Sequence, residues 1–101
     1  MLKAWIGEPV DMAPLRDELL VKVFAGYLVP NEILLEELEQ HRSQHQQRLA
    51  VYRQIEQDCF ENPDFLPIEE KFRYLTLRRG ISYEVDWLAW CDDAIAMLTF
   101  L

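Results

Sequence analysis

Two histidines one helical turn apart are the residues best placed for chemistry in this sequence. His41 and His45 have the i, i+4 spacing at which two imidazoles on one helix face can bind one metal ion. No glutamate follows His41 in the metalloprotease pattern, and no third ligand is evident in the sequence. Polar residues within an apolar seam more often set the alignment of helices. We therefore predict a structural role for both histidines, with no metal and no cofactor.

An arginine pair and two cysteines are the next candidates. Arg78 and Arg79 resemble a fork for phosphate. In an acidic helix such arginines more often pair with carboxylates, either neighbours such as Glu84 or those of a partner. Cys59 and Cys91 lie far apart within helical patterns, which favours buried free thiols over a disulfide and a cytoplasmic protein over a secreted one.

Catalysis is not expected from this sequence. Ser43 and Ser82 lack the context of a nucleophile elbow, and neither histidine stands beside a thiol. The three glycines form no phosphate-binding loop, and the carboxylates are scattered as on solvated helix faces. We predict that the protein is not an enzyme.

The charge of the chain argues against DNA binding by these residues. Acidic residues outnumber basic ones 18 to 10, which gives a net charge of −8, and the excess is spread along the chain. A protein that neutralises phosphates needs a surplus of lysine and arginine on one face. The longest apolar run, residues 94–98, is far too short to span a bilayer. Neither DNA nor a membrane is an expected partner.

The element pattern is all-α within one domain, residues 1–101. Residues 1–10 have no sustained hydrophobic periodicity and look like a connecting segment that leads into the first helix. A first helix is predicted from near Pro14, with Asp17 and Glu18 in its first turn and Gly26 as its stop. A long second helix should run from about Pro30 to Phe60, and a third from near Pro67 to the C-terminus. Gly80 is the weak point of the third helix, so three helices are favoured over four.

The long helices have the spacing of coiled-coil seams. The second helix carries a row that is apolar at its ends and polar from Gln40 to Arg48, so its middle should be partly solvated and fix the helix alignment. The third has two apolar rows on different sides: Ile68, Phe72, Leu75, Tyr83, Trp87, Trp90, Ala94, Met97 and Leu101, and Leu77, Ile81, Leu88, Ile95 and Leu98. A helix apolar on two sides must be covered on two sides, and a second subunit is the natural cover.

We therefore expect a helical homodimer. The aromatic side chains of the third helix can line a pocket for a planar ligand or form a subunit interface, and the interface is favoured at this spacing. Both roles can coexist. The candidate interface residues are Leu38, Leu49, Tyr52, Ile55, Phe72, Leu75, Tyr83, Trp87, Trp90, Ala94 and Met97.

Three segments resemble the C-terminal domain of PadR-like transcriptional regulators. Residues 15–24, LRDELLVKVF, are similar to the first helix of that domain, and residues 49–56, LAVYRQIE, to the end of its long helix. Residues 74–91, which include LRRGISYEVDWLAWC, look like its closing helix. Each segment is moderately specific, and their order and spacing strengthen the match, which covers almost the whole chain.

The resemblance implies a dimerisation domain. In that family an N-terminal winged helix-turn-helix binds DNA and the helical C-terminal domain dimerises. Residues 1–10, especially 2–5, would then correspond to the stretch after the wing, and the DNA-reading half would be absent from these 101 residues. Some members of the family sense phenolic acids or planar drugs, so the resemblance leaves open whether this domain binds a small aromatic effector. No ligand-binding residue of the family can be assigned to a position of this chain. The alternative function is a free-standing adaptor that binds a partner's amphipathic helix in an apolar groove.

Overall fold

The computed structural model describes residues 4, 6–9 and 17–101. From residue 17 onward the chain forms α2 (Glu18–Phe24), the 3-10 turn η1 (Gly26–Leu28), α3 (Asn31–Cys59), the 3-10 turn η2 (Pro63–Phe65) and α4 (Ile68–Thr99). No strand occurs in the described residues. The all-α prediction is confirmed, and Gly80 does not interrupt α4.

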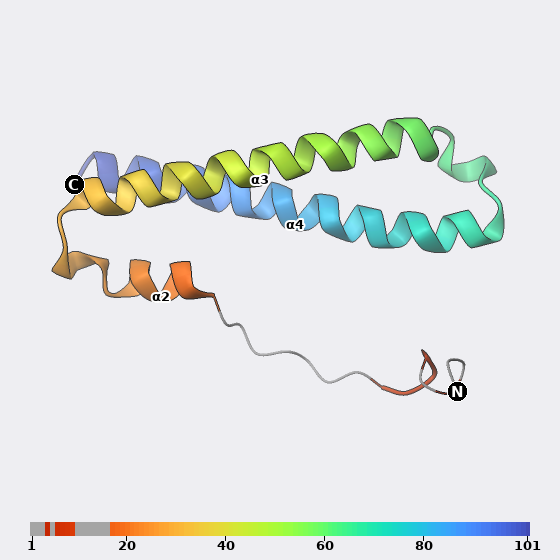
Figure 1. Ribbon diagram of the computed structural model, residues 1–101, viewed down its shortest axis with the longest axis horizontal. Coiled ribbons are helices and arrows are strands. Elements are labelled where there is room, and N and C mark those ends of the chain that lie inside the picture. The colour runs from red at the N-terminus through yellow and green to blue at the C-terminus, as the bar shows by residue number, and fades with distance from the viewer. Residues whose placement is uncertain (1–3, 5, 10–16) are drawn as a thin grey trace.

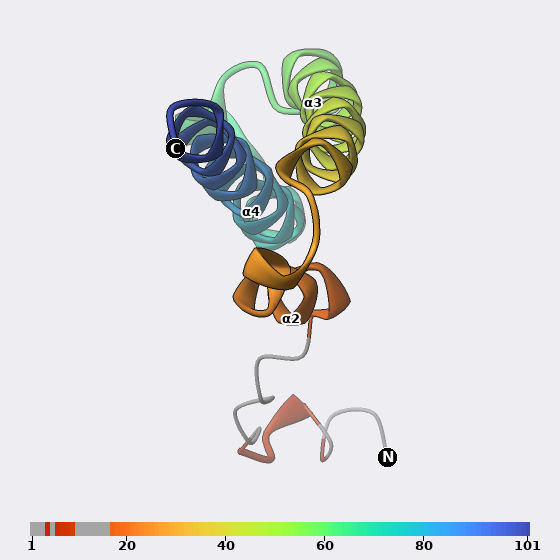
Figure 2. The same ribbon diagram turned by 90° about the vertical axis from the view of Figure 1, so that its left-hand side faces the viewer.

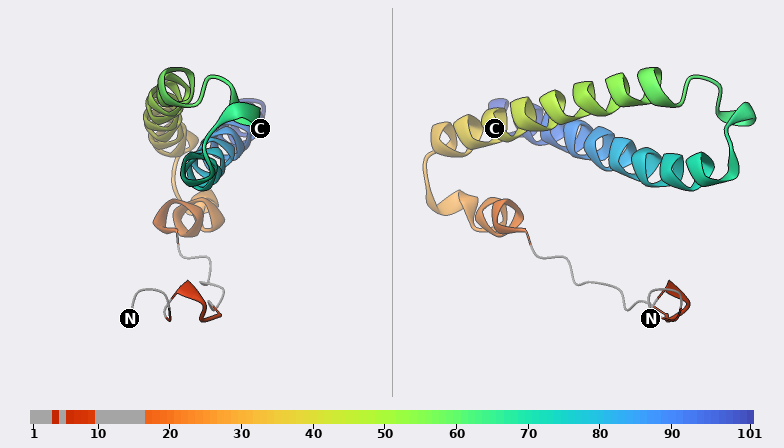
Figure 3. Two further views of the ribbon diagram at one scale, coloured as in Figure 1. Left: turned by 90° about the vertical axis from the view of Figure 1, so that its right-hand side faces the viewer. Right: turned by 45° about the vertical axis from the view of Figure 1, so that its right-hand side comes forward.

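The long helices α3 and α4 pack side by side in opposite directions along most of their length (Figure 1). The 3-10 turn η2 lies in the connection at one end of the pair (Figure 3). There Phe60 is buried and stacks on Tyr74 with ring centroids 5.1 Å apart. At the other end, the side-chain amide of Asn31 donates a hydrogen bond of 3.3 Å to the carbonyl oxygen of Leu98. Contacts at both ends thus fix the alignment of the hairpin.

The short helix α2 lies beside the long pair, at the end where α3 begins (Figures 1 and 2). It begins at Glu18 because Asp17 has an extended backbone and caps the helix: its carboxylate accepts hydrogen bonds from the amides of Leu19 and Leu20, at 2.9 and 3.3 Å. The expectation that Asp17 lies in the first turn is therefore wrong. Pro14, the predicted start, lies outside the described residues, as does most of the predicted connection over residues 1–10.

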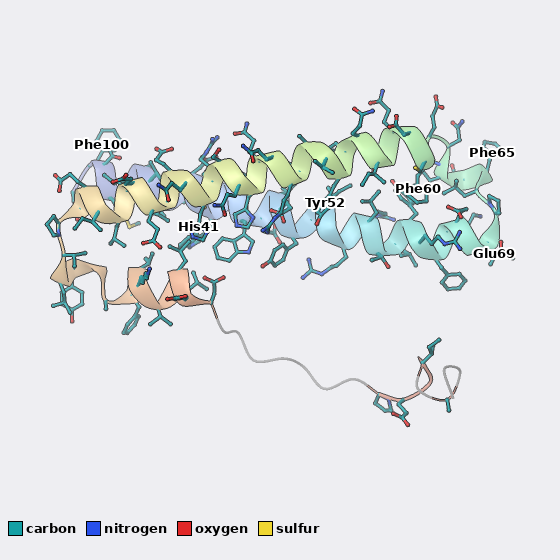
Figure 4. All side chains as sticks on the ribbon, viewed as in Figure 1. His41, Tyr52, Phe60, Phe65, Glu69 and Phe100 are labelled. Carbon is teal, nitrogen blue, oxygen red and sulfur yellow. The ribbon has the colours of Figure 1, made fainter. Side chains whose placement is uncertain are left out.

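Two glycines mark close approaches between elements. Gly26 follows the end of α2 as predicted, but its φ is not positive. A Cβ at Gly26 would collide with the side chain of Leu34, so this position needs a small residue for packing. A Cβ at Gly80 would lie 3.2 Å from the ring of Tyr52, whose side chain lies between α3 and α4 (Figure 4). Gly80 therefore lets α4 approach α3 closely.

Candidate functional site

One side of α4 is covered by the rest of the chain. We call this the covered face, and it consists of Leu77, Ile81, Glu84, Leu88, Cys91, Ile95 and Leu98. All of these side chains are buried or half-buried, and Cys91 is completely inaccessible. With Leu34 and Leu38 of α3, which are 4% and 0% exposed, this face forms the core of the hairpin. The second apolar row predicted for this helix, from Leu77 to Leu98, is thus covered by other side chains of the same chain.

The opposite side of α4 is apolar and largely uncovered. We call it the open face, and it consists of Ile68, Phe72, Leu75, Arg79, Tyr83, Asp86, half-buried Trp90 and Met97, with Leu101 just beyond the end of the helix. Ile68, Phe72 and Met97 are 71%, 68% and 71% exposed, and Leu75 is 58% exposed. Soluble monomers rarely expose large apolar patches, which makes the open face a candidate interaction surface.

An aromatic cluster stands at the edge of the open face nearest to α2. The rings of Trp87 and Trp90 meet edge to face with centroids 5.5 Å apart, and Tyr83 meets Trp87 in the same way at 6.4 Å. Leu20 of α2 joins these rings in lining a groove of about 330 Å³. Arg79 and Asp86 complete its lining. The groove is therefore apolar with one charge of each sign.

A buried polar pair lies behind these rings. Nδ1 of His45 hydrogen-bonds to Oε2 of Glu84, and the two side chains are only 9% and 2% exposed. The ring of Trp87 stacks almost parallel on His45, with centroids 5.1 Å apart and planes 6° apart. Arg48, largely exposed, places Nη1 3.8 Å from the other carboxylate oxygen of Glu84. The pair thus joins α3 to α4 inside the hairpin.

The sequence interpretation missed Glu84 as the partner of His45. Glu84 follows Ile81 by three positions and precedes Cys91 by seven, so it lies in phase with the covered face. An acidic residue within an apolar row is the signal in the sequence that could have indicated a buried polar pair. The suggested pairing of Glu84 with Arg78 or Arg79 is wrong: the guanidinium of Arg78 lies 5.9 Å from the ring of Tyr74, and Arg79 lines the groove.

The polar middle of α3 is otherwise placed as predicted. His41 is half-buried, with its ring 6.3 Å from that of His45, while Gln40, Gln44 and Gln47 are exposed. Arg42, next to His41, donates a hydrogen bond of 2.5 Å from Nε to Asp92, which raises the pKa of Arg42. No group of three potential metal ligands occurs among the described residues.

The two thiols have different environments. Cys91 is buried, and this burial raises the pKa of its thiol, with the negative charge of Asp92 adding to the effect. Cys59, the last residue of α3, is exposed, so the prediction that it is buried is wrong. Its position at the very end of α3, where the chain leaves the helix, accounts for this exposure. Both thiols are free.

The candidate interface residues fall into three groups. Phe72, Leu75, Tyr83, Trp90 and Met97 lie on the open face, and half-buried Trp87 and Ala94 lie beside it. Leu49 and Tyr52 are half-buried and Ile55 is 38% exposed, all on α3. Leu38 is 0% exposed within one chain, so its side chain is not accessible to a partner.

No helix in the described part of the chain is long and apolar enough to cross a membrane.

Comparisons with known proteins place the chain among regulators. Residues 15–99 match the family described as virulence activator alpha C-term. The virulence activator AphA of Vibrio cholerae is 28% identical and superimposes with a TM-score of 0.89, over 97% of this chain and 58% of that chain. This chain thus spans little more than half the length of AphA. No curated protein matches significantly. The family and fold are those of a transcriptional regulator domain and not of an enzyme family. The chain belongs to the virulence activator alpha C-terminal family.

Proposed function

We propose that this chain is the homodimerisation domain of a PadR-like transcriptional regulator. The observation that carries the proposal is the open face of α4, where large apolar side chains such as Phe72 and Met97 stay more than half exposed in a single chain. Obligate dimer interfaces are built from such surfaces and resemble a domain core cut in two. Membership of a family of activator C-terminal domains supports a role in a regulator.

The mechanism follows from two-fold symmetry. A two-fold homodimer uses the same surface patch on both subunits. This symmetry fixes the distance between any two equivalent domains attached to the subunits. In a dimeric regulator, a fixed spacing allows two recognition helices to meet half-sites about one turn of DNA apart. The domain therefore acts by geometry rather than by chemistry at a catalytic centre. The cytoplasmic location expected from the sequence fits this role and remains a prediction.

The mass in solution tests this proposal. Sedimentation velocity or light scattering at micromolar concentration should give a stable dimer of the 12.0 kDa chain. A monomer at that concentration contradicts the proposal. It would instead favour a helical adaptor, whose open face takes an amphipathic helix from a different protein.

DNA contact is proposed to lie outside these 101 residues, in a winged helix-turn-helix elsewhere in the regulator. The net charge of −8 supports this assignment. A gel shift at low salt with duplex DNA should show no saturable binding by this chain below about 1 µM, a concentration already at the tight end of ordinary non-specific binding. Saturable binding in that range would overturn the assignment.

The groove between α2 and α4 favours a second proposal, the sensing of a small aromatic effector. Its walls hold Tyr83, Trp87 and Trp90, which can stack on a planar ring. Titration with a phenolic acid and with a planar dye, read by tryptophan fluorescence, should show saturable quenching. The same titration of Trp87→Phe should show weaker quenching. Equal quenching in both proteins would place the ligand elsewhere.

A further inference from the structure

A small polar cleft lies where the start of α2, the middle of α3 and α4 meet. Its volume is about 160 Å³. One water molecule needs about 10–15 Å³ in this measure, so the cleft has room for about ten non-hydrogen atoms. It is lined by Asp17, His41, Gln44, His45, Arg48, Tyr83 and Trp87. Only Tyr83 and Trp87 also line the apolar groove. The cleft is therefore a second site, with the size of a small polar metabolite.

Two opposite charges face this cleft from different elements. Asp17 uses Oδ1 to cap α2, and its Oδ2 accepts no hydrogen bond from the described part of the chain. Arg48 on α3 is largely exposed, and its Nη1 approaches Glu84 only to 3.8 Å. Within the described residues, Asp17 and Arg48 form no ion pair with each other. An acceptor on α2 and a donor on α3 are thus available to one bound molecule.

The uncharged walls of the cleft suit the rest of such a molecule. The side-chain amide of Gln44 can both donate and accept hydrogen bonds. The rings of Tyr83 and Trp87 meet edge to face with centroids 6.4 Å apart. An aromatic ring attracts an ammonium group that lies within about 6 Å of its centroid. His45 is held through Nδ1 by Glu84, which leaves Nε2 for the cleft.

A simple ion fits this arrangement poorly. An anion such as phosphate would be repelled by the carboxylate of Asp17, and a metal cation would be repelled by the guanidinium of Arg48. A molecule that carries both an ammonium and a carboxylate group satisfies the two side chains at once. Each contact is then a charge-assisted hydrogen bond, which is stronger than a neutral one.

We infer that this cleft binds a small zwitterion of the free amino acid type, with its ammonium group at Asp17 and its carboxylate at Arg48. Asp17 caps α2 and Arg48 belongs to α3, so the bound molecule joins these two elements. It adds to the exposed ion pair of 3.1 Å between Lys22 of α2 and Glu37 of α3. The inference goes beyond the proposed homodimer and the proposed aromatic effector, and it depends on neither.

Titration with a panel of the common free L-amino acids tests the inference. Isothermal calorimetry of the wild-type chain should show saturable binding of at least one of them at millimolar concentration. The amide and the N-acetyl derivative of that amino acid each lack one of its two charges. Each should bind about 10- to 100-fold more weakly, because a hydrogen bond between charged groups is lost. Saturable binding by no member of the panel would overturn the inference.

Two substitutions assign the charges of the ligand to their partners. Arg48→Gln should weaken binding of the amino acid about 10- to 100-fold but leave binding of its amide unchanged, because the amide has no carboxylate. Asp17→Asn should weaken binding of the amino acid as much and leave that of the N-acetyl derivative unchanged. Asparagine caps a helix about as well as aspartate, so α2 is retained. A variant that weakens the amino acid and both derivatives equally would contradict the assignment.

Arg53→Gln is the matched control. Arg53 is exposed on the same helix, lies beside Glu56 and does not line the cleft, so the dissociation constant should stay within about twofold of the wild type. Hydrogen exchange gives a second readout. The bound amino acid should slow exchange of the amides of Leu19 and Leu20, which Asp17 caps. Binding without this protection would place the ligand outside the cleft.

Discussion

The covered face and the open face of α4 belong to one helix but differ in how their side chains are buried. The covered face contains Glu84, yet this carboxylate is paired with His45 from α3 and is 2% exposed. The open face contains Phe72, whose side chain is 68% exposed. A polar side chain is therefore buried on α4 where another helix supplies a hydrogen-bond partner, and large apolar side chains stay exposed where neither α2 nor α3 packs against them. Burial on α4 follows pairing and not residue type alone.

The largest expected effect is on the covered face. Glu84→Ala removes the carboxylate that His45 contacts and leaves a cavity beside a buried imidazole. We expect a loss of about 3–5 kcal/mol in the free energy of unfolding, as for other broken buried pairs. Urea denaturation at fixed protein concentration measures it. Glu36→Ala, an exposed glutamate on α3, is the control and should change the free energy by less than about 0.5 kcal/mol. Equal losses would show that the pair is not in the interior.

A second effect should appear on the open face. Phe72→Ala should raise the dissociation constant of the dimer by about 30-fold, or about 2 kcal/mol, because a large aromatic side chain buried in an interface is worth that much. Val51→Ala, exposed on α3, should leave the dissociation constant unchanged. Sedimentation equilibrium compares them. If Phe72→Ala has no effect on the dissociation constant, this part of the open face does not lie in the interface.

The two histidines provide a matched pair of substitutions. His45→Leu leaves the buried carboxylate of Glu84 without its hydrogen bond and should lower the free energy of unfolding by about 1–3 kcal/mol. Arg48 limits this loss, because its Nη1 lies 3.8 Å from the other carboxylate oxygen of Glu84. His41→Leu, one turn earlier and half-buried, should change stability by less than about 0.5 kcal/mol. Thermal melts with and without a chelator give both values. A chelator-induced drop in the wild type would instead point to a metal bound by the two imidazoles.

The smallest effect is expected at Gly80. Gly80→Ala should stabilise α4 by up to about 1 kcal/mol, because alanine is the better helix former. The new Cβ would lie 3.2 Å from the Tyr52 ring, which is half-buried beside a hollow that both residues line. The ring therefore has room to move. A loss of stability in urea denaturation would show that Tyr52 is held rigidly.

Sequence reasoning predicted the long helices well because their signals are local. Prolines precede both, and steps of three and four residues run through each, so their limits were placed within a few residues of Asn31–Cys59 and Ile68–Thr99. The start of the short helix α2 was placed less well. Asp17 caps the helix through side-chain bonds to Leu19 and Leu20. An acidic residue suits a cap and a first turn almost equally, so composition alone did not separate the two.

The candidate site was predicted only in part, because spacing assigns residues to a side of a helix and not to a neighbour. The two apolar rows of α4 were recognised, but the sequence did not say which one α3 would cover. Leu38 was included among interface residues although it is fully buried in one chain. Glu84 was read as a surface partner for arginine although it pairs with His45 in the interior.

The sequence by itself determined an all-α chain of long amphipathic helices with more apolar surface than one copy can bury, because periodicity and turn residues are properties of the chain alone. Only the tertiary structure decided how that surface is divided. Packing α4 against α3 buried Ile81, Glu84 and Cys91 and left Phe72 and Met97 in solvent. The reason is physical: which of two similar helix faces is buried depends on the shape and charge of the element that packs against it.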